Sequence, residues 1–180
     1  MATTITETRP RIEAREAGRS AVGEQIVAGA IAGMIGAVLM GLWAMISMAI
    51  KGMGFWLPMD LIDGIWAGPM VILGGAGYAL GGVVTHMIFA AMTGAAFGVI
   101  LPRGIGWGGA LISGLLYGAL IWVVMTFAGL PLVNSTMSAR VSLVQANFFW
   151  EHLLYGFGLS LTPVLMRSFA RTSHPSTAAR

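Results

Sequence analysis

The chain is predicted to be an all-α, polytopic integral membrane protein folded as a four-transmembrane-helix bundle. Two observations predict this fold class. Of the 180 residues, 57% are hydrophobic and only 9% are charged, whereas a soluble domain carries about 25% charged residues. The sequence also holds four apolar stretches close to the ~20 residues that a helix needs to cross a bilayer. This number of charged residues is too small to cover a surface that faces water. Most of the surface must therefore contact lipid or partner protein.

The predicted spans belong to one membrane domain, 21–170. A long apolar stretch, 65–101, exceeds the length of one straight span. Its first part, 65–77, contains Pro69 and several glycines, which assigns it to an interfacial or re-entrant segment. The predicted spans are about 26–50, 78–100, 107–128 and 147–166.

The positive charges predict how the chain is oriented. One side of the membrane receives the polar tails 1–20 and 171–180 together with Arg103 and Arg167, and thus eight of the ten Lys and Arg residues. The other side receives Lys51 and Arg140. Positive residues are enriched in cytoplasmic segments. We therefore expect a multi-pass protein of the bacterial inner membrane with both termini in the cytoplasm.

Several function classes find no support in the sequence. The chain has no cysteine, so disulfides and thiolate chemistry are excluded. The net charge of +3 sits at the chain ends rather than in a stripe, so nucleic acid is not an expected partner. No nucleophile–base pair or nucleotide-binding motif is present, so no catalytic residue is assigned. The expected partners are the lipid bilayer and either further copies of the chain or a larger membrane complex.

Small residues recur every four positions in each span. Residues four apart share a helix face, and small ones let helix backbones approach closely in lipid, so these rows predict tight packing. The first and third spans also resemble each other, and each precedes a Gly- and Pro-containing loop and a helix with one histidine, which indicates two duplicated helical hairpins. The rows are Gly29–Gly33–Ala37–Gly41, Gly82 with Ala90–Gly94–Gly98, Ala110–Gly114–Gly118 and Gly156–Ser160.

Two histidines, His86 and His152, fall inside the second and fourth predicted spans. Both lie in small-residue rows and near the outer ends of their spans. Ionisable residues are costly inside a membrane, which makes them functional candidates. In a ring of four antiparallel helices the second and fourth spans are diagonal, so the two rings are expected to face each other across the bundle.

Four roles stay open for the histidine pair. Each ring can simply hydrogen-bond a backbone carbonyl or serine across a helix interface. The pair can ligate haem b through two imidazoles. It can bind copper, or relay protons with Glu151 beside it and Asp60 or Asp63 above. Arg140 is a candidate partner for these acids or for an anionic group. The thioethers expected near a copper site belong to Met45, Met48, Met53, Met59, Met70, Met87 and Met137.

Three segments carry a family resemblance: VVTHMIFAAMTGAAFGVILP, the tryptophan-led GWGGALISGLLYGALIW, and FFWEHLLYGFGLSL. In this order they resemble the small bacterial inner-membrane proteins of the YagU-like type, over roughly 81–171. The resemblance implies a similar topology and location, with His86 and His152 matching the family's intramembrane histidines. It implies no biochemical activity.

Three functions follow as hypotheses. The first is a non-catalytic inner-membrane protein, or accessory subunit of a membrane complex, with a paired-histidine site in the outer half of the bundle. The second is an electron-transfer subunit that binds haem b. The third is a small transporter or channel for protons or metal cations, which would need several copies because four short helices rarely enclose a pathway.

Overall fold

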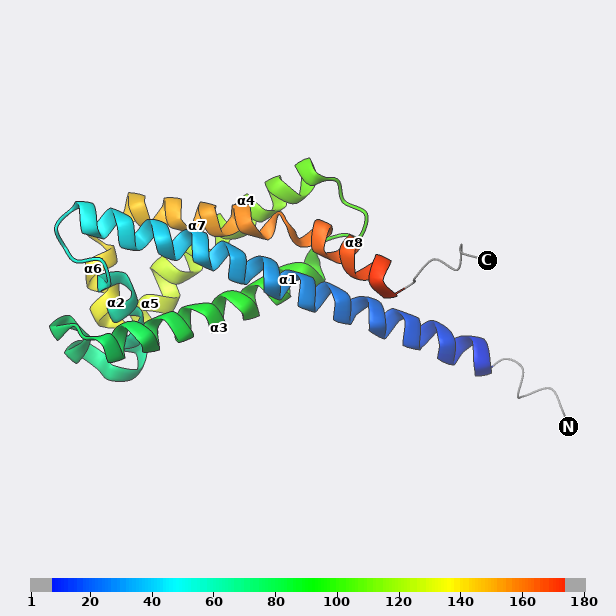
Figure 1. Cartoon of the computed structure of the whole chain (residues 1–180), viewed down its shortest axis with the longest axis horizontal. Helices are drawn as coiled ribbons and strands as arrows, with labels where there is room; N and C mark the ends of the chain where they lie inside the picture. The colour runs from blue at the N-terminus through cyan, green and yellow to red at the C-terminus, as the bar shows by residue number, and fades with distance from the viewer. Residues whose placement is uncertain (1–7, 174–180) are drawn as a thin grey trace, which may run out of the picture.

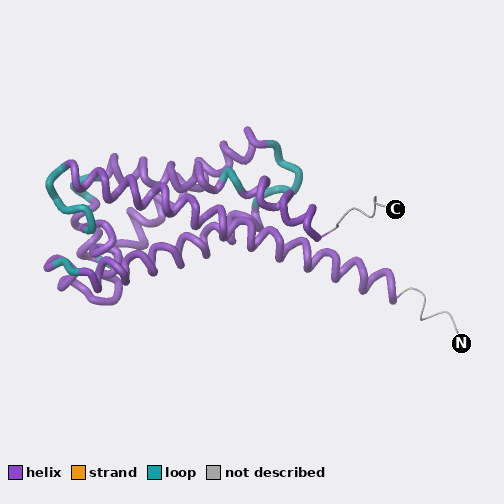
Figure 2. Tube along the Cα trace, viewed as in Figure 1, coloured by secondary structure: helices purple, strands orange, loops and turns teal. Residues whose placement is uncertain are grey.

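The computed structural model describes residues 8–173, and this part of the chain is helical without strands (Figures 1 and 2). The all-α prediction is therefore confirmed for the described residues. The main helices are α1 (Thr8–Ile50), α3 (Ala76–Ile100), α4 (Trp107–Val124), α7 (Gln145–Leu159) and α8 (Thr162–Ser173). The shorter elements are α2 (Leu57–Ala67), the 3₁₀-helix η1 (Gly68–Leu73), the π-helix η2 (Met125–Gly129), α5 (Leu130–Val133) and α6 (Ser135–Val141).

The long helices run lengthwise through the molecule, and the short elements gather at one end (Figure 1). We call this end, formed by residues 51–75 and 129–144, the capped end. Both ends of the described chain lie at the opposite end, which we call the tail end, and the first part of α1 projects beyond it (Figure 1). The two ends of the described chain, residues 8 and 173, thus share one side of the bundle, as the charge pattern predicts. Which side of a membrane that is stays a prediction.

Three helices within the described range are long and apolar enough to cross a membrane: Ala21–Ile50, Ala76–Ile100 and Trp107–Val133. They coincide with the first three predicted spans. The predicted N-terminal tail is helical from residue 8 and continuous with the first span, so it is not a separate surface helix. The remainder of the two predicted tails, 1–7 and 174–180, lies outside the described residues.

The predicted fourth span is divided into two helices, α7 with 15 residues and α8 with 12. Pro163 explains the break, because it has no N–H to donate to Leu159 and its ring would clash with that carbonyl in a continuous helix. Two hydroxyls donate to backbone carbonyls at this break. Ser160 Oγ donates to Phe157 O at 2.6 Å, and Thr162 Oγ1 donates to Leu159 O at 2.7 Å. Neither helix alone has the ~20 residues of a span.

The small-residue rows are confirmed as packing surfaces. Gly29 and Gly33 of α1 lie against Gly94 and Gly98 of α3, with nothing between the two backbones. A Cβ added to Gly29 would lie 2.8 Å from the Cα of Gly98 and closer still to the carbonyl of Gly94. Real Cβ atoms do not approach other atoms so closely, so only glycine permits this helix separation.

The same kind of contact joins the second pair of helices and links the two pairs. Gly118 of α4 lies against Gly156 of α7, with 3.2 Å between an added Cβ and the Gly156 Cα. Between α1 and α7, a Cβ on Gly158 would lie 2.6 Å from Gly36 N. Thus α1 pairs with α3 as α4 pairs with α7, which is the arrangement that two duplicated hairpins would have.

Substituting a packing glycine should destabilise the bundle. We expect Gly29→Ala to lower the free energy of unfolding by about 1–3 kcal/mol, because its Cβ forces α1 and α3 apart. Thermal unfolding in detergent measures this. Gly23→Ala, on the same helix with nothing within 4 Å of the added Cβ, is the control and should not lower stability. Equal melting temperatures for the two variants would contradict the assignment.

Candidate functional site

A cavity of about 310 Å³ lies in the half of the bundle nearer the capped end. Both His86 and His152 line it, together with Thr93 and Tyr155, and the rest of its wall is apolar. This volume falls in the range of small-molecule sites, about 300–1,000 Å³. The structure therefore brings the two predicted histidines to one place. We call it the histidine cavity.

Each imidazole is held by a backbone carbonyl. The ring of His86 crosses from α3 to α1, where its Nε2 lies 3.1 Å from Ala37 O. The ring of His152 bonds within α7, with Nδ1 at 2.8 Å from Phe148 O. The Phe148 ring also packs edge-on against the His152 ring, with centroids 4.4 Å apart. The predicted structural role, a carbonyl bond across a helix interface, is confirmed for His86.

Two further polar residues of the wall were not predicted from the sequence. Tyr155 of α7 donates its hydroxyl to Ala90 O at 2.9 Å, and the Thr93 hydroxyl lies 2.7 Å from it. Tyr117 of α4 donates to Thr93 O at 2.9 Å. The sequence did contain a signal for this contact, namely a tyrosine inside an apolar span. A buried phenol hydroxyl usually finds a hydrogen-bond partner, so such a tyrosine indicates a polar contact within the bundle.

The histidine cavity reaches exposed residues of α3 and of α5, the short helix that continues from α4 through η2. Phe89 and Val133, which line it, are 49% and 55% exposed. Nearer the tail end, Tyr117 closes the gap by packing against Phe97, with ring centroids 5.2 Å apart. Toward the capped end no further ring–ring contact joins α3 to α4 within residues 8–173, and residues of both helices line the cavity.

The π-helix η2 forms part of the cavity wall. Met125 and Gly129, its first and last residues, both line the cavity. Pro131 accounts for this local widening, because it cannot donate a hydrogen bond to Phe127 and would clash with that carbonyl in a regular α-helix. The wider turn carries the helix past the proline to Val133, five residues beyond the predicted end of the third span.

The acids Asp60 and Asp63 lie on α2 at the capped end and do not line the histidine cavity. They are only 6% and 9% exposed. Asp63 abuts α3, where a Cβ on Gly81 would lie 2.8 Å from its Cγ. Asp60 Oδ1 has no hydrogen-bond partner among the described residues. Burial raises the pKa of Asp60, and the neighbouring Asp63 raises it further.

Glu151 and Arg140 line a second, smaller cavity of about 80 Å³. Glu151 is buried and accepts a hydrogen bond from Asn147 Nδ2, which also donates to Ser47 Oγ at 3.0 Å. Arg140 is exposed and makes no ion pair within residues 8–173. Although Glu151 precedes His152 in the sequence, the two side chains line different cavities. The structure does not assemble them into the predicted proton relay.

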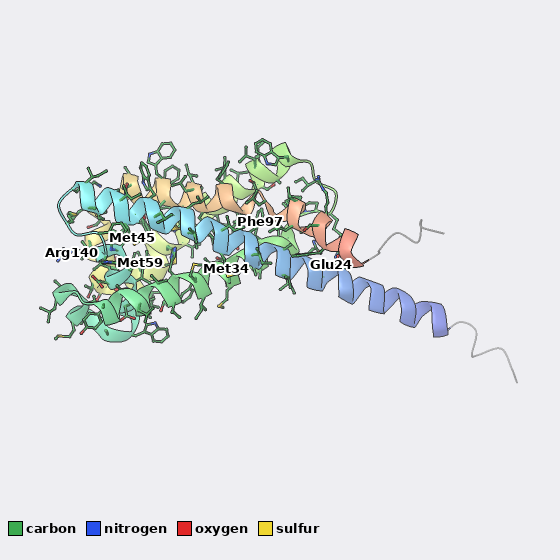
Figure 3. The ribbon with its side chains drawn as sticks, in the orientation of Figure 1. Glu24, Met34, Met45, Met59, Phe97 and Arg140 are labelled. Atoms are coloured by element: carbon green, nitrogen blue, oxygen red, sulfur yellow. The ribbon has the colours of Figure 1, made fainter. Side chains whose placement is uncertain are left out.

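The predicted methionine ligands do not gather at the histidine cavity. Only Met137 of the seven lines the histidine cavity. Met45 and Met59 form a separate apolar cluster at the capped end (Figure 3), and Met70 is 54% exposed. In the described part of the chain, no three His, Cys, Asp or Glu residues are grouped to hold a metal. The seven predicted methionines therefore do not surround the histidine pair as the copper hypothesis required.

The hydrogen bonds of the histidines also bear on haem binding. With Nε2 of His86 held by Ala37 O, only its Nδ1 is left to ligate a metal. This atom lies next to the Cβ of its own side chain, which hinders the approach of a flat macrocycle. The arrangement therefore favours a small ligand over a haem between the two rings.

Comparison with known proteins gives no relative for this chain: no family model, no curated protein and no solved structure matches it. The resemblance to YagU-like proteins stays a prediction.

The acids at the capped end should make stability depend on pH. Because the pKa of Asp60 is higher in the folded protein than in the unfolded chain, the folded state binds the proton more tightly. Folding stability should therefore rise as the pH falls from neutral toward 3.8, the ordinary Asp value. Asp60→Asn should be more stable than the wild type at neutral pH and should flatten this dependence.

Thermal unfolding as a function of pH measures the effect. Glu24→Gln, at the far end of the molecule (Figure 3), is the charge-matched control and should keep the wild-type profile. A profile that Asp60→Asn leaves unchanged would contradict the assignment of the pH dependence to this carboxyl.

Proposed function

We propose that this is an integral protein of the bacterial inner membrane that crosses the bilayer four times, with α7 and α8 together forming the fourth crossing. Three helices have the length and hydropathy of a span. Residues 145–173 form a 29-residue segment that is helical except for a turn at Ser160 and Leu161. Trp66, Trp107 and Trp150 are more than half exposed, as expected of side chains at a membrane interface.

Within that membrane protein, the histidine cavity is proposed to bind a small apolar ligand without catalysing its conversion. The observation that carries this proposal is an apolar cavity of about 310 Å³ whose wall includes exposed apolar residues of α3 and α5, on the surface assigned to lipid. A ligand dissolved in the bilayer could enter between α3 and α4 without passing through water. The two imidazoles are the polar groups that would orient it.

A transporter or channel receives less support. The half of the bundle toward the tail end is closed by glycine contacts and by a core cluster that includes Phe97, Leu101 and Leu159. Neither cavity extends into this half. A pathway across the bilayer would therefore have to run between subunits.

The proposed orientation predicts which loops face the outside. The chain has no cysteine, so single cysteines report accessibility directly. Met53→Cys, in the exposed loop at the capped end, should react with a membrane-impermeant maleimide in intact spheroplasts. Arg103→Cys, in the exposed loop at the tail end, should react only after permeabilisation. The reverse pattern would place the termini outside, and equal reaction of both would argue against membrane insertion.

Photolabelling tests the proposed ligand site. A photoactivatable alkyl aryl ether added to vesicles that contain the protein should crosslink to residues 86–93 and 121–130, and excess unlabelled 4-octylanisole should compete. Ile121→Trp fills the cavity and should reduce this labelling at least several-fold. Tandem mass spectrometry locates and quantifies the crosslinks.

The matched control is Leu116→Trp, on the same helix but 66% exposed and outside the cavity wall. It should label like the wild type. Labelling that is spread over exposed apolar residues and is not reduced by competitor would contradict a bound ligand, since that is the pattern of bulk lipid contact.

A further inference from the structure

We infer that the histidine cavity selects ligands that donate a hydrogen bond, namely lipophilic alcohols, phenols and hydroquinols. The inference rests on the proposed function, because it concerns the ligand of the same cavity. It follows from the acceptors to which the polar side chains of the wall donate their protons. These polar residues are His86, Thr93, His152 and Tyr155.

The partners of the two imidazoles fix their tautomers. A backbone carbonyl can only accept a hydrogen bond, so the ring nitrogen bonded to it must carry the hydrogen. His86 is therefore protonated on Nε2, which bonds Ala37 O, and His152 on Nδ1, which bonds Phe148 O. No carboxylate bonds either ring among the described residues, so the neutral form is the one that burial favours. Each neutral ring then keeps one lone pair, on Nδ1 of His86 and Nε2 of His152.

The two hydroxyls of the wall have no proton left to offer. The Tyr155 hydroxyl is within bonding distance of Ala90 O, and the Thr93 hydroxyl of Phe89 O at 2.8 Å. The two hydroxyls also bond each other at 2.7 Å. Whichever oxygen donates in that pair, both protons end on oxygen atoms of the protein.

The side chains of the cavity therefore present acceptors and no free donors. Each of the two imidazoles that line the cavity keeps one nitrogen lone pair, and apart from Thr93 and Tyr155 the rest of the wall is apolar. A carbonyl, carboxylate or phosphate would find no side-chain proton and would lose its hydration without replacement. A hydroxyl on an apolar body would instead donate to an imidazole nitrogen while its body fills the cavity.

A pair of probes that differ by one donor tests this selectivity. 4-Octylphenol carries a hydroxyl proton, and 4-octylanisole replaces that proton with a methyl group. Both compete in the photolabelling of the protein in vesicles, corrected for their partition into lipid. We expect 4-octylphenol to compete about tenfold more strongly, which corresponds to one added hydrogen bond in a dry site.

His152→Phe removes one acceptor and should reduce this preference toward unity. The substitution is mild, because the Phe148 carbonyl still accepts the backbone N–H of residue 152 within α7. Trp150→Phe, on the same helix and 59% exposed, is the control and should keep the preference.

The outcomes separate the two proposals. Equal competition by both probes, saturable and lost in Ile121→Trp, would overturn the donor selectivity and leave the ligand site standing. Failure of both probes to compete would overturn the proposed function itself. If the preference for 4-octylphenol persists in each of the two single variants, His152→Phe and His86→Phe, the assignment of the hydrogen bond to the imidazoles is overturned.

Discussion

The direct contact of helix backbones at paired glycines is the constraint on which the rest of the structure depends. Where glycines of α1 meet glycines of α3, no side chain separates the helices, and they lie as close as their backbones allow. In lipid, where apolar side chains gain little by leaving their solvent, such close packing is a main source of helix association. It also sets the distance across which His86 reaches Ala37 O and Tyr155 reaches Ala90 O. The polar contacts are thus a consequence of the glycine contacts.

The cavity arises where this close packing gives way. Toward the tail end, Gly29 and Gly98 hold α1 and α3 together, and Tyr117 bridges α3 and α4. Toward the capped end, α3 turns its packing surface to α2, where Gly82 meets the backbone of Met59. At the same level α4 widens into η2 and ends in short helices. The space between α3 and α4 is lined there by the histidine rings and apolar side chains.

Hydropathy and residue spacing predicted the helices, the glycine contacts and the meeting of the two histidines, because each is determined by a period along one helix. Features that depend on the rotation of one helix against another were missed. Glu151 and His152 are neighbours in sequence, yet successive helix residues point about 100° apart and these two line different cavities. The break at Pro163 was visible in the sequence but hidden by the apolar run around it. The burial of Asp60 depends on how α2 folds over α3, which no local pattern encodes.

A bundle that only had to be stable would not need the polar residues of this cavity. Leucine or phenylalanine at positions 86 and 152 would fill the space, whereas each imidazole leaves one nitrogen lone pair without a partner among the described residues. An unpaired acceptor in an apolar site costs free energy, and the two carbonyl bonds hold the rings so that these lone pairs cannot turn away. Such preorganised acceptors recover that cost only when a donor arrives. The same hydrogen bonds that stabilise the histidines therefore also define the kind of ligand that the cavity is built to receive.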